Sequence, residues 1–255
     1  MTANRKSQIV QLLKGIETGD PASVVVVNED KYIQHNPQTH EGSEGLARLF
    51  ERLSKTSPRV NIVRIFEDGD FVFAHTEYDF ASRNIGFEIF RFEDGYAVEH
   101  WDNIQPRRGP NRDGHSMVDG VTEISDPGQT ECNRRTIRKF VDHVLIPGDV
   151  AILADYIDQD QYTEHNPLIG SAPAELVRVL AEPANDEPVA ADYRKCHRIL
   201  AEGDFVLTVC EGYAHAVHAS FFDLYRLSDG RIVEHWDTTE MIPPRSEWKN
   251  TNGKF

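Results

Sequence analysis

DGYAVEHWD at residues 94–102 returns 135 positions later as DGRIVEHWD at residues 229–237. Two other stretches repeat in the same order before them. YIQHNP at residues 32–37 returns after 130 positions as YTEHNP, and GDFV at residues 69–72 returns after 134. Sequence motifs that recur in the same order and at nearly constant spacing indicate an internal repeat. The chain is therefore predicted to contain two homologous domains.

The repeats place the domains at residues 1–108 and 130–245, with a linker at 109–129 and a polar tail at 246–255. Residues 106–129 contain three prolines and four glycines and almost no periodic apolar pattern, which is typical of an exposed linker. Each domain has enough residues to fold alone and is small enough to gain from pairing with its copy.

Each copy begins with a helical pattern and ends with strands. Apolar residues at helical spacing predict a first helix in each copy: Ile9, Leu12, Leu13 and Ile16, with Gly19 as its end, and Ile137, Phe140, Val141 and Val144. Further helices are expected after Asp20 and Asp149, and at residues 44–55 and 174–182. In copy 1, β-rich segments predict strands at residues 59–66, 71–78, 85–92 and 97–104. Helices followed by an antiparallel sheet predict the α+β class, with helices packed on one face.

The charge and composition of the chain limit the classes of partner that it is expected to bind. The chain has 27 basic and 42 acidic residues, a formal net charge of −15, which argues against nucleic acid and membrane partners. Its first residues lack the apolar stretch of a signal peptide, so we expect a cytoplasmic protein. Three cysteines without a CxxC spacing support neither a disulfide framework nor a zinc knuckle.

The last strand of each copy carries the residues best suited to chemistry. Side chains alternate along a strand, so His100 and Asp102 share one face while Glu99 and Trp101 share the other. In copy 2, His235 and Asp237 correspond to His100 and Asp102.

The preceding strand supplies a second carboxylate if the hairpin register is right. A three-residue loop at residues 93–95 would place Glu88 opposite His100, and the equivalent loop at 228–230 would place Asp223 opposite His235. A two-residue loop would shift the parity and put Glu88 opposite Trp101.

A cluster of this kind under the helices would form the floor of an apolar pocket for a small molecule. Burial raises the pKa of a carboxylate, which can then take a proton from a carbon next to a carbonyl and return it. His35 and His165, in the His-Asn-Pro turns, would close over the pocket mouth and hydrogen-bond a substrate oxygen.

Other interpretations remain open. The Glu, His and Asp side chains could be structural, the His-Asn-Pro turn could serve only the backbone, and Trp101 and Trp236 fit packing anchors better than ligand stackers. Two histidines and a carboxylate could also hold zinc or iron, but no HExxH motif accompanies them. We predict a site without metal or cofactor.

The ordered motifs, His-Asn-Pro, Gly-Asp-Phe-Val and DGxxVEHWD, resemble the SnoaL-like family, the polyketide cyclases and aldol-condensation enzymes of the nuclear-transport-factor-2-like superfamily. The resemblance covers most of each copy. It implies two tandem cone-shaped α+β domains, each with a curved antiparallel sheet and helices closing a pocket. It also implies pairing of the two domains through their sheets, and it leaves a further homo-oligomer open.

The resemblance also implies roles for residues. The aspartate that acts as general acid/base in the cyclases falls on Asp102 and Asp237, and the family histidine beside it falls on His100 and His235. A second family histidine falls on Glu88 and Asp223, where this chain departs from the pattern. The implied activity is a cofactor-free cyclase, isomerase or lyase acting on a small apolar carbonyl compound. The alternative is a non-catalytic small-molecule-binding module with the same fold.

Overall fold

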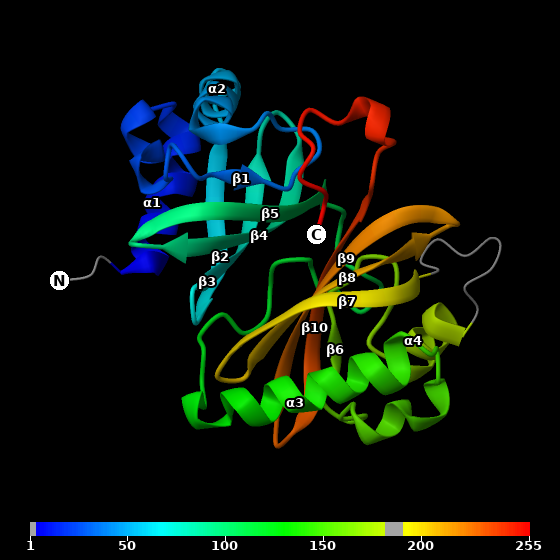
Figure 1. Ribbon diagram of the computed structural model, residues 1–255. Coiled ribbons are helices and arrows are strands. Elements are labelled where there is room, and N and C mark those ends of the chain that lie inside the picture. The colour runs from blue at the N-terminus through cyan, green and yellow to red at the C-terminus, as the bar shows by residue number, and fades with distance from the viewer. Residues whose placement is uncertain (1–3, 182–190) are drawn as a thin grey trace. The chain divides into compact units, whose positions relative to one another are not determined.

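The computed structural model of the chain describes residues 4–181 and 191–255. The chain divides into two compact units (Figure 1). Unit 1 comprises Met1–Arg107 and Ile242–Phe255, and unit 2 is Arg108–Met241. Both units contain helices followed by a five-stranded sheet, so the predicted α+β class is confirmed.

The helices of unit 1 follow the predicted pattern. They are α1 (Arg5–Thr18), the short 3₁₀ helix η1 (Pro21–Val26) and α2 (Gly42–Ser54). The four apolar residues predicted for the first helix are all buried. Gly19 ends α1 at a positive φ of 69°, and its N–H donates to the carbonyl of Gly15. The side chain of Asp20 caps η1 by accepting from the N–H of Ala22.

Unit 2 repeats this arrangement with small changes. It contains the short 3₁₀ helix η2 (Pro127–Gln129), then α3 (Thr130–Phe140), whose last turns widen into the π-helical η3 (Val141–Leu145), then η4 (Val150–Asp155) and α4 (Pro173–Ala181). The apolar stripe predicted across residues 137–144 is buried. The helix predicted at 174–182 is confirmed as far as Ala181, and Glu182 lies outside the described residues.

The two sheets have the same topology. In unit 1 the strands are β1 (Ile33–Gln34), β2 (Arg59–Asp68), β3 (Phe71–Asp79), β4 (Arg83–Glu93) and β5 (Tyr96–Pro106), in the order β1-β5-β4-β3-β2. In unit 2 they are β6 (Thr163–Glu164), β7 (Ala191–Glu202), β8 (Phe205–Ala214), β9 (Val217–Ser228) and β10 (Arg231–Met241), in the order β6-β10-β9-β8-β7. Each sheet is mixed rather than purely antiparallel, because its two-residue strand pairs in parallel with its last strand.

The hairpin between β4 and β5 differs from the expected one. Its loop has two residues, Asp94 and Gly95, both at positive φ (52° and 85°), as a type I′ turn requires. The register then shifts at Val98, where β5 has one residue more than β4. The hairpin of β9 and β10 repeats the turn at Asp229 and Gly230 and has the same irregularity after Ile232.

The bulge decides which side chains meet on the sheet. A two-residue loop alone would reverse the faces, but the extra residue restores the parity. Glu88 therefore pairs with Asp102, and Asp223 pairs with Asp237. The predicted pairing of Glu88 with His100 was wrong, whereas the prediction that all three side chains share one face holds.

The segments expected to be a linker and a tail pack onto the units. In unit 2, Asn111 is 4% exposed and its side-chain amide donates to the carbonyl of Glu164. In unit 1, Asn250 is 7% exposed and donates to the carbonyls of Asn36 and Thr39. Because these amides satisfy backbone carbonyls beside the short parallel strands, the segments belong to the folded units rather than to exposed connections.

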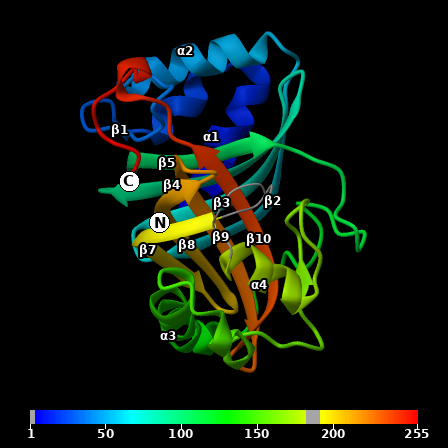
Figure 2. The ribbon, with the colours of Figure 1, turned by 90° about the vertical axis from the view of Figure 1, so that its right-hand side faces the viewer.

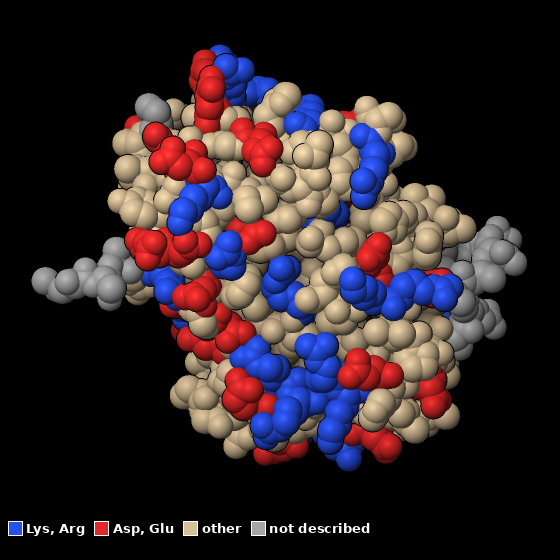
Figure 3. Space-filling model, viewed as in Figure 1, with Lys and Arg blue, Asp and Glu red and all other residues tan. Residues whose placement is uncertain are grey.

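On the face drawn in Figure 3, acidic and basic side chains are interspersed. Basic side chains gather over α3, whose sequence contains Arg134, Arg135, Arg138 and Lys139. Within the described residues, no helix is both long and apolar enough to cross a membrane.

Candidate active site

A cavity of about 350 Å³ lies in unit 1 between the helices and the sheet. Helices α1 and α2 lie along one side of strands β2 to β5 (Figure 2). They supply the apolar wall of the cavity: Leu12, Leu13, Ile16, Leu46, Leu49, Phe50 and Leu53. The sheet supplies Glu88, His100 and Asp102. The predicted arrangement, an apolar pocket with two carboxylates and an imidazole on its floor, is therefore present in unit 1.

His100 is held at both of its ring nitrogens. Its Nδ1 is 3.0 Å from Oε1 of Gln34, an oxygen that also accepts from the backbone N–H of Asn36. Because Gln34 presents an acceptor, Nδ1 carries a hydrogen. The Nε2 atom lies 2.8 Å from Oε2 of Glu88. The imidazole is 6% exposed and stacks on Phe90 with ring centroids 4.4 Å apart.

Glu88 links the imidazole to a tyrosine. Its Oε1 accepts a hydrogen bond of 2.7 Å from the hydroxyl of Tyr78, and the residue is 3% exposed. Burial and the negative charge of Glu88 raise the pKa of Tyr78 well above its usual range, so the hydroxyl keeps its proton and acts as the donor. The two oxygens of Glu88 thus engage the imidazole of His100 and the hydroxyl of Tyr78.

Asp102 has one engaged and one available carboxylate oxygen. Its Oδ2 accepts a 2.7 Å hydrogen bond from the side-chain amide of Asn36. Among the described residues no donor hydrogen-bonds Oδ1, which lies 3.7 Å from Nζ of Lys254. Asp102 is 4% exposed and lines the cavity. This carboxylate therefore has an oxygen able to meet a ligand.

Unit 2 carries the same cluster with one more negative charge. Glu164 takes the place of Gln34, and its two carboxylate oxygens both lie 3.0 Å from Nδ1 of His235. Nε2 of the same ring is 3.2 Å from Oδ1 of Asp223. Burial opposes a charged ring, but the two carboxylates outweigh it and raise the pKa of His235 well above its usual value. His235 is therefore an imidazolium at neutral pH.

The carboxyl of Asp237 has a displaced pKa. Burial, followed by the nearby negative charges of Glu164 and Asp223, raises its pKa to about 7, although His235 and the hydrogen bond from Asn166 act in the opposite direction. Asn166 donates to Oδ2 over 2.9 Å, as Asn36 does to Asp102. A group with a pKa near neutrality is well matched to taking and returning a proton at pH 7.

The turn histidine of unit 1, His35, is on the opposite face of the sheet from the cavity. Nε2 of His35 is 2.9 Å from Oε1 of Glu99, its Nδ1 is 2.8 Å from the carbonyl of Gly253, and its ring stacks on Trp101 at 4.6 Å. His35 is not among the residues that line the cavity. The expectation that it closes over the pocket mouth was wrong, because β1 ends at Gln34 and alternation turns the next side chain away.

His165 repeats this position in unit 2. Its Nε2 is 3.0 Å from Oε1 of Glu234, and its ring stacks on Trp236 at 4.6 Å. Trp101 and Trp236 are 2% and 1% exposed, which supports their role as packing anchors. The carboxylates beside the histidines are held in turn by Arg91 and Arg226, at 2.7 and 2.6 Å.

We expect His35→Ala to lower the free energy of unfolding of unit 1 by about 1–3 kcal/mol, because Glu99 and the carbonyl of Gly253 would lose a buried partner. The imidazole resonances of His100, on the other face, should keep their chemical shifts. Urea unfolding and imidazole NMR measure the two effects, with His40→Ala, an exposed histidine of the same segment, as control. A displaced His100 signal with unchanged stability would contradict this assignment.

Several residues of the site were not predicted from the sequence. Gln34, Asn36, Glu164 and Asn166 lie in the repeated YxxHNP motif, so their recurrence beside the histidine was an available signal. Lys254, from the C-terminal segment, also donates to the carbonyl of Asp102 over 2.7 Å. No local pattern marks a lysine so distant in sequence from its contact.

The sequence suggested that two histidines and a carboxylate of one copy could hold a metal. In unit 1 the two histidines, His35 and His100, do not come together, because they are on opposite faces of the sheet. Instead, Glu88, His100 and Asp102 each offer a ligand atom within 4.8 Å of the others. Both nitrogens of His100 already face Gln34 and Glu88, so a metal there would have to displace the hydrogen bond to Glu88.

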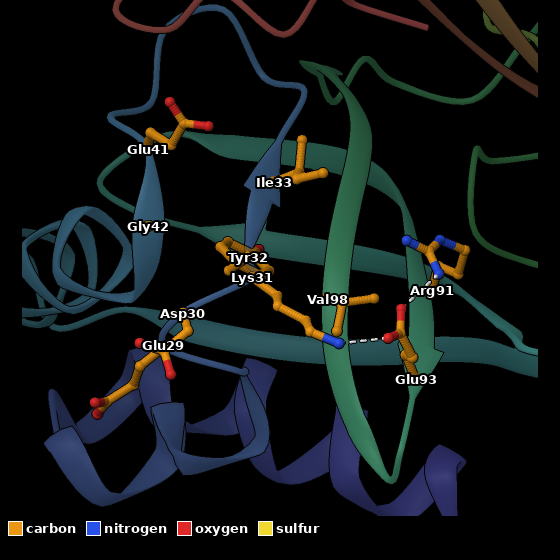
Figure 4. Close-up of a pocket in the computed structure, with 10 residues that line it drawn as sticks. All are labelled: Glu29, Asp30, Lys31, Tyr32, Ile33, Glu41, Gly42, Arg91, Glu93 and Val98. Carbon is orange, nitrogen blue, oxygen red and sulfur yellow. Dashed lines mark hydrogen bonds and ion pairs between the residues drawn. The ribbon is translucent and has the colours of Figure 1, made fainter.

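A second hollow in unit 1, of about 610 Å³, is lined mainly by charged side chains (Figure 4). Nζ of Lys31 lies 2.5 Å from Oε1 of Glu93, whose other oxygen is 3.7 Å from Arg91. Because Lys31, Glu93 and Arg91 pair with one another and the lining contains no imidazole, the hollow lacks the histidine–carboxylate set of the smaller cavity. We therefore assign the chemistry to the smaller cavity.

None of the curated proteins compared with the chain matches it. Solved structures do match, at low identity. TsrD from Streptomyces laurentii is 20% identical, with 40% of this chain and 87% of that chain covered and a TM-score of 0.36. An NTF2-like protein of unknown function from Cytophaga hutchinsonii is 17% identical (42% and 94% covered, TM-score 0.36). An LEH-like epoxide hydrolase of M. tuberculosis is 18% identical (39% and 81%, TM-score 0.35).

The comparison with protein families gives one match, the SnoaL-like domain, over residues 9–100. These residues run from α1 into the last strand of the first sheet and include Glu88 and His100. Unit 2 lies outside the matched residues, and its sheet repeats the same strand order. The residues similar to the SnoaL-like domain therefore all lie in the first unit of this chain.

Proposed function

We propose that the chain is a cofactor-free acid/base enzyme that acts on a small apolar carbonyl compound, in an aldol or isomerase type of reaction. The observation that carries the proposal is the available Oδ1 of Asp102, buried beside the Glu88–His100 pair in a cavity with an apolar wall. A cavity of this volume with an apolar wall and a group of polar side chains is a usual form of a small-molecule site.

Asp102 is the base in this proposal. Its Oδ1 takes the proton from the carbon next to the substrate carbonyl, while Asn36 fixes the orientation of the carboxylate through Oδ2. The electron pair left on carbon moves into the carbonyl and makes an enolate. Return of the proton to another carbon completes an isomerisation, and attack of the enolate carbon on a second carbonyl completes an aldol reaction.

The other members of the cluster position the base and its surroundings. His100 and Glu88 hold one another and Tyr78, so the floor of the cavity is fixed before the substrate arrives. Gln38 and Lys249 also line the cavity and offer donors for an enolate oxygen. In unit 2, the pKa of about 7 at Asp237 supports the same role for that residue.

Proton exchange tests this proposal with a simple probe. The full chain is incubated with 2-tetralone in D₂O, and loss of the α-proton signal is followed by ¹H NMR. We expect exchange faster than in buffer, and slower exchange in Leu49→Trp, which reduces the cavity volume from its helical wall. Saturation-transfer NMR showing bound ketone with α-protons that exchange only at the buffer rate would instead favour a non-catalytic binding module.

A further inference from the structure

A second cluster of chemically active side chains lies in unit 2, apart from His235 and Asp237. His115 and Asp119 come from the segment between the two repeats, and His165 comes from the turn after β6. One ligand atom from each lies within 4.8 Å of the others. We propose that these three residues form a binding site for a divalent transition metal ion, Zn²⁺ or a neighbour of it such as Co²⁺.

The surroundings of His165 support a cation at this point. Its Nε2 faces Oε1 of Glu234 at 3.0 Å, while its Nδ1 lies 2.7 Å from Oδ1 of Asp119 and 2.8 Å from the carbonyl of Ser116. A single ring hydrogen on Nδ1 cannot point straight at two oxygens. A metal ion bound to Nδ1 would replace this hydrogen and displace its hydrogen bond to Asp119, whose carboxylate could then bind the ion, with His115 adding a second imidazole.

Glu234 supplies the outer contact that metal-bound histidines usually have. A ligating imidazole generally donates its other N–H to a carboxylate, which fixes the ring and its tautomer. Glu234 accepts from Nε2 of His165 and is itself held by Arg226 at 2.6 Å. The ring is 1% exposed and stacks on Trp236, so Nδ1 has a fixed direction before any ion arrives.

The loop that carries the other two residues is fixed to the same strands. The backbone N–H and the side-chain oxygen of Asn111 both bond to the backbone of His115, and its amide nitrogen donates to the carbonyl of Glu164. Asp119 Oδ1 accepts from the N–H of Ser116, and the carbonyl of Asp119 accepts from the indole of Trp236. The donor set is thus preorganised on β6 and β10.

The donor types and their exposure indicate which ion would fit. Two imidazoles and one carboxylate suit Zn²⁺ and Co²⁺, whereas Mg²⁺ and Ca²⁺ prefer oxygen ligands. The side chain of Asp119 is 46% exposed and His115 is half-buried, so the site opens to solvent and leaves positions for water. Unit 1 offers an internal comparison, because Nδ1 of His35 faces the carbonyl of Gly253 with neither a second histidine nor an aspartate in the set.

Calorimetric titration of the metal-free full chain with ZnCl₂, and with CoCl₂ followed by visible absorption, tests the site. We expect one equivalent to bind, and His115→Ala or Asp119→Asn to weaken that binding at least about 10-fold. Both substitutions are on the loop and leave buried His165 in place, and circular dichroism checks the fold. His143→Ala, an exposed histidine of unit 2, is the control and should bind like the original chain.

Two results would overturn the site. One is the absence of Zn²⁺ and Co²⁺ binding below millimolar concentration in the original chain. The other is binding that His115→Ala and Asp119→Asn leave unchanged while the His143→Ala control reduces it. Neither result depends on the proposed acid/base reaction, because the readout is metal binding alone.

Discussion

Replacing both Asp102 and Asp237 with Asn is expected to lower the rate of α-proton exchange from 2-tetralone by about 100- to 10,000-fold, the range that a positioned general base contributes. Asn keeps an oxygen that can accept from Asn36 or Asn166, so the local hydrogen bonds can persist. It cannot take a proton at neutral pH. The loss should therefore appear in turnover and not in folding.

The two single variants show how much of the exchange activity each unit contributes. If both units are active, Asp102→Asn and Asp237→Asn each remove a part of the rate, and if one unit is active, one variant alone removes nearly all of it. Exchange rates by ¹H NMR and melting temperatures by calorimetry are the measurements, with Glu29→Gln, on the rim of the charged hollow, as a control for charge. A double variant with the full exchange rate would reject Asp102 and Asp237 as bases.

The second large effect is on stability in unit 2. Asp237→Asn is expected to make unit 2 more stable than the original at pH 8, by about 2–4 kcal/mol, because the original must ionise a buried carboxyl there. The pKa of Asp237 is raised to about 7 in the folded chain, against about 3.9 in an unfolded one. Its contribution to stability is therefore complete below about pH 4 and is lost as the pH rises through 7.

The pH dependence of the stability difference between Asp237→Asn and the original chain provides the test. The gain in the free energy of unfolding of unit 2 that Asp237→Asn produces should be smaller at pH 5 than at pH 8. It should not increase further above pH 8. Hydrogen-exchange mass spectrometry of peptides from β9 and β10 in urea reads unit 2 separately. Asp102→Asn is the matched control in unit 1, where the change removes a carboxylate 3.7 Å from the buried ammonium of Lys254 and no stabilisation is expected. Equal advantages at pH 5 and pH 8 would contradict the pKa assigned to Asp237.

One substitution between the repeats accounts for the electrostatic difference between the units. Gln34 places a neutral oxygen against His100, whereas Glu164 places a carboxylate against His235. Although burial opposes it, the interaction with His235 holds the pKa of Glu164 below its usual range, and the two groups stabilise one another as an ion pair. The units share a fold and a cluster, but they hold different charges in it.

The main helices, the face of the last strand and the presence of two copies could all be predicted from the sequence. Apolar spacing located α1 and α3, the repeated motifs located two copies, and alternation along β5 placed His100 and Asp102 on one face. These features depend on neighbours within a few residues, where the periods of helix and strand are fixed by backbone geometry. The same reasoning placed Glu88 and Asp223 on the correct face only because of a bulge that it did not foresee.

The contacts that the site residues make became known only from the folded structure. A single extra residue at Val98 set the pairing of Glu88 with Asp102, and the end of a two-residue strand turned His35 away from the cavity. The contact of Lys254 with Asp102 and that of Asp119 with His165 join residues far apart in the chain. Such contacts depend on how distant segments pack, and the spacing of residues along one segment carries no information about that.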